Sequence, residues 1–334
     1  MTVITGRAIH RVLAPPSAEV TFRVRGFHVG RPQARDHLEH VGGRFLAGLE
    51  YGMTEPGERA IAARLETVPW EYRGFAYEGA SMALAILDGL LPGGGRLRRF
   101  VDGPAAHQIY TAHVGAGWAL ARLPRALRPR VRLGDPLLRW LALDGFGFHE
   151  AYFRTPVVVG ERRPPRPPRG FPGSARDAAR VVDQGIGRAM WFVCGADADH
   201  LAGTIAGFAP GRRANLWAGT GLAAAYAGYR SAAGLADDPA GSRAVEESLR
   251  ELASCAGKHL PDVAQGAAFA AKARHLAGEV TPHTAIAVRV LCGMEVADAA
   301  RCTDEALPAD PAAADAYQNW RHRIRERLVV RERK

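Results

Sequence analysis

The chain has 334 residues, of which 47% are hydrophobic and 23% are charged, and its formal net charge at pH 7 is +10. This balance is typical of a globular protein with a sizeable core and argues against a disordered chain. Arginines carry most of the positive charge and are scattered along the sequence, whereas a nucleic-acid binder clusters its basic residues on one face with aromatic residues between them. We therefore expect a globular protein with no nucleic-acid partner.

The cysteines and the apolar segments bear on the compartment. The four cysteines lie far apart without a CxxC pair, which argues against a disulfide framework or a zinc ribbon. Residues 1–20 lack the apolar core of a signal peptide, and Asp88 interrupts the best candidate for a membrane span, residues 80–91. The expected protein is cytoplasmic and not transmembrane.

The first part of the chain changes from a strand-like to a helical pattern. Residues 21–29, TFRVRGFHV, partly alternate apolar and polar side chains, which predicts a short strand or extended arm within an N-terminal region of residues 1–33. From residue 34 the apolar residues recur with a helical period. Helices are predicted from residue 34, over 54–68, 75–91 and 105–123, and from the N-cap Asp135 to residue 153. Residues 34–154 form the first predicted helical half.

Residues 155–174 contain six prolines and predict a stiff Pro/Arg-rich connector before a second helical half, residues 175–334. Three segments of the second half resemble segments of the first in the same order: 175–192 resembles 34–51, 205–225 resembles 65–85, and 266–273 resembles 115–122. The expected fold is all-α, with two similar halves related by internal duplication and packed as one unit about a pseudo-twofold axis.

Several glycines lie inside the apolar helices, where each costs about 1 kcal/mol relative to alanine. They are Gly79, Gly115, Gly117, Gly219 and Gly221. Either the helices approach one another closely at these positions, or the glycines leave room for a bulky apolar ligand. They do not form a nucleotide fingerprint, because no strand precedes them.

Acids, bases and phenols within the same helices are the candidate catalytic groups. His149 and Tyr152 share a helical face and could form a proton-transfer pair, with Asp144 in the same segment, or they could simply be packing residues. Glu78 lies in an apolar helix and must be paired, solvated or raised in pKa, and Arg73 or an arginine of the second half is its expected partner.

A second group of polar residues precedes Trp118. His107, Tyr110 and His113 form a stripe that could be a polar patch in a cavity wall or an ordinary, partly exposed helix face. A metal site is disfavoured, since no HExxH motif is present. Asp197, in ADADH, could be a ligand for a divalent ion but is more simply a helix cap. The predicted catalytic residues are His149, Tyr152, Tyr110, Glu78 and Asp144. The predicted substrate-binding residues are Trp118, His113, Tyr77, Trp191, Trp217 and Gln265. No cofactor or metal is predicted.

Six segments together resemble a known family over residues 20–325. They are FAYEGASMALAILDG, HVGAGWALARLP, DPLLRWLALDGFGFHEAYF, DQGIGRAMWF, ANLWAGTGLAAAYAG and QGAAFAAKAR. The chain resembles a bacterial family catalogued as domain of unknown function 1702, which is encoded in enediyne biosynthetic gene clusters beside the iterative polyketide synthase.

The resemblance implies an accessory protein in the formation of the enediyne core from a long polyene. A helical cavity lined by aromatic residues and glycines would suit such a flexible apolar chain. The first hypothesis is a cofactor-free isomerase, cyclase or lyase that acts on a hydrophobic polyene or polyyne intermediate. The second is a non-catalytic carrier of that intermediate, and the third is a scaffold for the other biosynthetic proteins. A homodimer is possible under each hypothesis.

Overall fold

The computed structural model describes residues 16–331 except residues 229–238. The described residues form helices joined by turns and loops and contain no strand, which confirms the all-α prediction. The α-helices are α2 Phe22–Arg25, α3 Pro32–Thr54, α4 Glu58–Leu65, α5 Arg73–Leu90, α6 Arg96–Val101, α7 Ile109–Arg122, α8 Leu141–Phe153, α9 Ala175–Val193, α10 Ala198–Ala206, α11 Pro210–Tyr226, α12 Pro239–Ala256, α13 Leu260–Ala277, α14 Pro282–Cys292, α15 Val296–Glu305 and α16 Ala316–Arg331.

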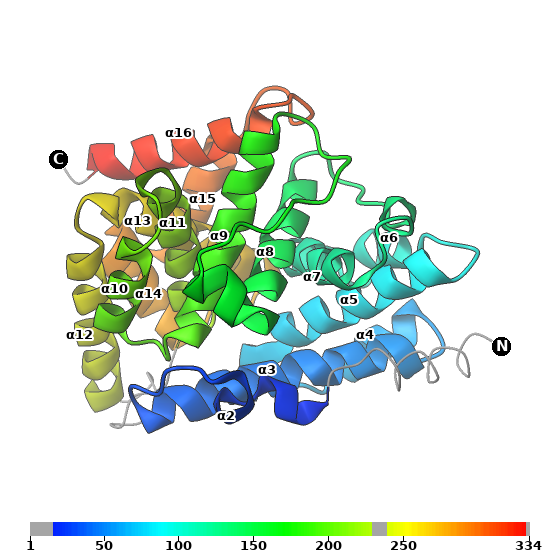
Figure 1. Cartoon of the computed structure of the whole chain (residues 1–334), viewed down its shortest axis with the longest axis horizontal. Coiled ribbons are helices and arrows are strands. Elements are labelled where there is room, and N and C mark those ends of the chain that lie inside the picture. The colour runs from blue at the N-terminus through cyan, green and yellow to red at the C-terminus, as the bar shows by residue number, and fades with distance from the viewer. Residues whose placement is uncertain (1–15, 229–238, 332–334) are drawn as a thin grey trace.

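Seven of these helices form the centre of the fold. In the order α3, α5, α7, α8, α9, α11 and α13, each packs against the next. Helices α14, α15 and α16 pack around α13, and α12 packs on α14. In Figure 1, α3 runs along the lower edge, α16 along the upper edge, and α9 passes between them. No helix in the described part of the chain is long and apolar enough to span a membrane.

A Gly-x-Gly motif recurs in α7, α8, α9 and α11 and explains why each of these helices has two close neighbours. Residues two apart on a helix point about 200° apart, so the two glycines face opposite sides. In α9, a methyl group on Gly185 would overlap the carbonyl oxygen of Asp144 in α8, and one on Gly187 would overlap that of Leu216 in α11. The backbones of these helices therefore touch at their crossings.

The same contact accounts for the glycines that the sequence singled out. An added methyl group at each of them would overlap a backbone carbonyl oxygen of a neighbouring helix, so close helix approach is confirmed as their role. The overlapped carbonyls belong to Phe45 for Gly79, Glu78 for Gly115, Ala142 for Gly117, Gln184 for Gly219 and Val263 for Gly221.

The contacts of Gly79 and Gly219 correspond to each other, since the segments that carry these glycines are among those that predict an internal duplication. Gly79 crosses α3 at Phe45 and Leu49, and Gly219 crosses α9 at Gln184 and Arg188. The two predicted halves also meet directly, because α8 packs along α9. The duplication itself, with its pseudo-twofold axis, stays a prediction.

The predicted strand at residues 21–29 is wrong. Thr21 accepts a hydrogen bond from the backbone N–H of Val24, and Gly26, at φ 66°, ends the single turn α2 in a left-handed conformation. Alternating side chains make a strand only where another strand offers backbone partners, and the described chain has none. Phe22 is instead buried against Phe27.

The connector is partly helical. Residues 156–160 form one turn of π-helix before the extended, proline-rich stretch. The stretch packs on the body of the protein, because Arg212 donates to the carbonyl of Arg162 and Arg139 donates to that of Gly170.

We expect Gly219→Ala to lower the free energy of unfolding by about 3 kcal/mol, because its methyl group would meet the backbone of α9 rather than a side chain that could move. The control is Gly43→Ala in α3, where nothing lies within 4 Å of the added methyl group. This control should be neutral or stabilise by up to about 1 kcal/mol. Urea unfolding of both variants measures the difference, and equal effects would contradict the backbone contact.

Candidate functional site

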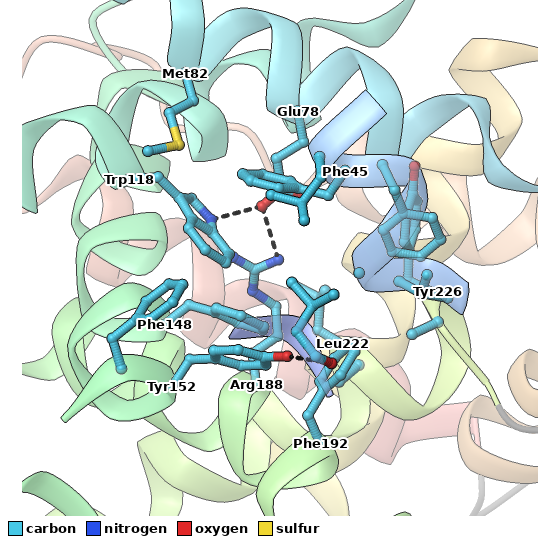
Figure 2. Close-up of a pocket in the computed structure, with 18 of the residues that line it drawn as sticks. Phe45, Glu78, Met82, Trp118, Phe148, Tyr152, Arg188, Phe192, Leu222 and Tyr226 are labelled. Carbon is cyan, nitrogen blue, oxygen red and sulfur yellow. Dashed lines mark hydrogen bonds and ion pairs between the residues drawn. The ribbon is translucent and has the colours of Figure 1, made fainter. Parts of the chain in front are cut away.

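A cleft opens between α3, α5, α7, α8, α9 and α11 (Figure 2). The cavity volume of the cleft is about 50 Å³, so the cleft is narrow. The wall is mostly aromatic and aliphatic. Its lining residues are Val20, Val41, Gly42, Phe45, Leu46, Phe75, Glu78, Met82, Trp118, Arg122, Phe148, Tyr152, Phe153, Arg188, Phe192, Leu222, Ala223, Tyr226 and Ala227.

The cleft wall follows from the Gly-x-Gly motif. In each of the four helices that carry it, the residue after the second glycine and the residue one turn later both line the cleft. These pairs are Trp118 and Arg122 in α7, Phe148 and Tyr152 in α8, Arg188 and Phe192 in α9, and Leu222 and Tyr226 in α11. Because the glycines fix how each helix is rotated against its neighbours, the same position on every helix faces the same space.

Glu78 is the carboxylate of the cleft wall, and its side chain is 5% exposed. Its Oε1 accepts a hydrogen bond of 2.8 Å from Nε1 of Trp118 and lies 3.6 Å from Nη1 of Arg188. Figure 2 shows both contacts converging on this oxygen. The expected pairing of Glu78 with an arginine of the second half is therefore confirmed, and the partner is Arg188.

Arg188 joins Glu78 to a second buried carboxylate. Its Nε lies 2.8 Å from Oδ1 of Asp144, an ion pair whose angle falls outside that of a hydrogen bond. The guanidinium carbon also lies 4.5 Å from the centre of the Phe148 ring. On the far side of Asp144, Oδ2 accepts from Nε2 of Gln184, which also donates to the hydroxyl of Tyr317. The guanidinium of Arg188 therefore contacts two buried carboxyl groups.

The charge balance of this cluster determines the protonation of Glu78. The closer contact pairs Arg188 with Asp144, so an ionised Glu78 would add a second buried negative charge. Burial raises the pKa of Glu78 above its ordinary value of 4.5, and the nearby Arg188 and the hydrogen bond from Trp118 only partly oppose this effect. Glu78 is therefore suited to hold a proton that it can exchange within the cleft.

Tyr152 lines the cleft as predicted for a site residue, but its hydroxyl donates to the carbonyl of Val20 at 3.3 Å. Burial raises the pKa of this phenol. Val20 itself lines the cleft and packs against Gly42 of α3, where a larger side chain would meet it. Tyr152 thus holds the N-terminal segment against the cleft.

His149 lies behind the wall. Its Nε2 accepts from Nε of Arg122, a lining residue, and its ring packs against Trp118 and Phe153. Burial lowers the pKa of His149, so the imidazole is held neutral. The predicted His149–Tyr152 proton-transfer pair is therefore not assembled in the cleft, since each side chain is bonded to a different group.

Several other predicted residues lie away from the cleft wall. Asp144 lies one layer behind it, within the ion cluster. Tyr77 donates to Glu66 and stacks on Phe100, and Trp191 donates to the carbonyl of Gly228. Gln265 accepts from Arg321, and Trp217 is buried in α11. These contacts hold helices together. Trp118 is the predicted substrate-binding residue that does line the cleft.

His113 and Tyr110 also lie outside the cleft. His113 lines a second, polar groove with Arg98, Arg132 and Asp135, and its Nδ1 donates to the carbonyl of Ile109. Tyr110 is half-buried, and burial raises the pKa of its phenol. His113 thus lies in the wall of a polar groove, as the stripe predicts, but Trp118 lines the separate apolar cleft.

Asp197 caps α10 as predicted, but Asp135 bonds only the turn before the 3-10 helix Leu138–Trp140, and α8 begins later, at Leu141. Asp135 accepts from the N–H groups of Leu137 and Leu138, and Asp197 accepts from that of His200. Asp197 also lies 3.3 Å from Nε2 of His28. Within the described residues no group of three or more His, Cys, Asp or Glu side chains is arranged to hold a metal ion.

The most informative residue that sequence reasoning missed as a site is Arg188. Its position after a Gly-x-Gly motif, equivalent to that of Trp118 in α7, was the available signal. The same signal identifies Phe148 and Leu222, and one turn later Phe192 and Tyr226.

The fold and the site together define an all-α protein with a narrow apolar cleft and a buried carboxylate–guanidinium cluster in its wall. The chain belongs to the family described as "Protein of unknown function (DUF1702)", whose model matches residues 4–328. Comparisons with curated proteins and with solved structures found no match.

Proposed function

We propose that this protein acts on a hydrophobic, polyketide-derived polyene or polyyne during enediyne core formation, through a redox-neutral proton-transfer reaction of the isomerase, cyclase or lyase type. The observation that carries the proposal is a buried carboxyl group, Glu78, in the wall of a narrow apolar cleft, where burial raises its pKa. The enediyne context comes from the sequence resemblance described above.

The shape and chemistry of the cleft support an unsaturated chain as the ligand. Aromatic rings cover much of the wall. The ring centre of Trp118 lies 4.4 Å from that of Phe45 and 4.9 Å from that of Phe148. Flat conjugated chains pack well on such rings, whereas a branched or polycyclic ligand would need more width.

Glu78 supplies the proton chemistry in this proposal. In its neutral form it transfers a proton to one carbon of the conjugated chain, and the resulting carboxylate takes a proton from another carbon. The double bonds shift and no electrons are gained or lost. Arg188, 3.6 Å from Oε1, stabilises the carboxylate during the interval between the two transfers.

The alternative is a carrier that shelters the same ligand without changing it. A carrier requires only the apolar wall, whereas two carboxylates and a guanidinium buried beside the ligand cost desolvation free energy that a carrier has no need to spend. The ion cluster therefore favours catalysis. A scaffold role would not require the cleft.

We expect Leu222→Trp to abolish function by filling the cleft, because Leu222 is a half-buried lining residue away from the ion cluster. The measurement is the yield of the enediyne product in a producing strain that lacks the gene and is complemented with each variant. Leu276→Trp, at a 40% exposed position on α13, is the control and should restore full yield.

Accumulation of a polyketide-derived polyene in the strain lacking the gene would support the proposed step. Normal product yield in the deletion strain would refute it. Full yield from a folded Leu222→Trp variant would exclude the cleft as the functional site.

A further inference from the structure

Arg188 has a hydrogen-bond donor with no partner among the described residues. Its side chain is 9% exposed, and its Nη2 is buried without a hydrogen-bond partner among the described residues. Its Nη1 and Nε face Glu78 and Asp144, respectively. An unpaired donor on a buried guanidinium is costly. Arg188 lines the cleft, so a small shift of its guanidinium on binding would bring Nη2 to an acceptor on a ligand there.

We infer that the ligand of this cleft is a neutral, unbranched conjugated chain that ends in a carbonyl group, whose oxygen accepts from Nη2 of Arg188. This inference rests on the proposed function and narrows its substrate class. The chain then lies along the aromatic wall, with its carbonyl end beside Glu78.

A neutral carbonyl fits the charges of the site better than a carboxylate. Asp144 already balances the charge of Arg188, and Glu78 faces the same guanidinium as a neutral acid, so an anionic ligand would leave a net negative charge in this buried site. The other cation of the wall, Arg122, donates to His149. A carbonyl oxygen satisfies the unpaired donor without adding charge to a buried site.

Two other donors of the cleft wall are already bonded. Nε1 of Trp118 donates to Glu78, and the hydroxyl of Tyr152 donates to Val20. The unpaired donor therefore lies at one place, the ion cluster, which orients a ligand with a single polar end.

Three probes of equal chain length test the inference: all-trans decatetraenal, decatetraenoic acid and decatetraene. The aldehyde should bind about tenfold or more tightly than the hydrocarbon, because a hydrogen bond from a charged donor contributes about 1.5 kcal/mol or more. Its absorption band should also move to longer wavelength on binding, since a donor at the carbonyl oxygen stabilises the charge-separated excited state. The acid should bind more weakly than the aldehyde at pH 8.

The matching variant is the pair Arg188→Met with Asp144→Asn, which removes the donor together with its charged partner. It should lose the preference for the aldehyde and the absorption shift, but keep its affinity for the hydrocarbon. Arg250→Met with Glu246→Gln, an exposed ion pair on α12, is the control and should behave like the wild-type protein.

The outcomes separate this inference from the proposed function. Equal binding of aldehyde and hydrocarbon without a shift would overturn the carbonyl site and leave the apolar cleft standing. Tighter binding of the acid, or a shift that persists in the variant without Arg188, would also overturn it. Failure of all three probes to bind would overturn the proposed function as well.

Discussion

Glu78→Gln should reduce the yield of the enediyne product by about 100-fold or more in a complemented deletion strain, because a positioned acid–base group contributes about 10²–10⁴ to a rate. Glutamine keeps an oxygen that can accept from Trp118 and removes only the exchangeable proton. A carrier would tolerate this change. The variant therefore separates catalysis from carriage, whereas filling the cleft with Leu222→Trp would block both functions.

A stability measurement tests the protonation of Glu78 independently of any product. Because its pKa is raised in the folded protein, Glu78 contributes stability that is complete below its unfolded pKa and is lost as the pH rises through the folded pKa. Glu78→Gln resembles the neutral form and lacks this dependence. The unfolding free energy of the variant minus that of the wild-type protein should increase as the pH rises above about 4.5. This difference should become constant once the pH exceeds the folded pKa. A difference that is constant between pH 4.5 and pH 8 would show that Glu78 does not retain its proton.

Arg188→Met should lower the free energy of unfolding by about 3–5 kcal/mol, since it leaves Asp144 buried without its counter-ion. Asp144 is fully buried, so water cannot replace the guanidinium without a structural change. Adding Asp144→Asn to the same chain should recover part of the loss, because the uncompensated charge is then removed. Urea unfolding of the two single variants and the double variant gives the coupling between the two residues.

The control for this loss is Arg250→Met, which breaks an exposed ion pair with Glu246. Surface pairs contribute less than about 1 kcal/mol, so this variant should remain close to the wild-type protein. Equal losses at Arg188 and Arg250 would mean that the buried cluster adds nothing beyond an ordinary surface pair.

Local patterns predicted the elements of this fold well. The helical period from residue 34 onward, the cap at Asp197 and the all-α class all follow from interactions within a few residues. The strand at residues 21–29 failed for the opposite reason, because a strand is defined by a partner elsewhere in the chain. The short helix α6 was missed, and its start depends on Asp88, which accepts from the N–H groups of Arg96 and Leu97 across a loop.

The candidate site was predicted only in part. Glu78, Tyr152 and Trp118 were chosen as polar or aromatic residues within apolar helices, and the cleft contains all three. His149 has the same sequence signature and lies behind the wall, because one position along α8 changes the facing direction by about 100°. The type of residue indicates chemistry, but the rotation of its helix decides whether that chemistry reaches the cleft.

By itself, the sequence determined the all-α class, most helices of the first half, the unusual glycines within them and the presence of an unusual carboxylate at position 78. Each of these depends on periodicity or on the absence of a side chain, which are properties of a short segment. Only the tertiary structure decided that Glu78, Asp144 and Arg188 meet, since they come from α5, α8 and α9. In the folded protein, the carboxyl groups of Glu78 and Asp144 both contact the buried guanidinium of Arg188. That arrangement, which no single segment contains, raises the pKa of Glu78 and leaves a buried donor of Arg188 without a hydrogen-bond partner among the described residues.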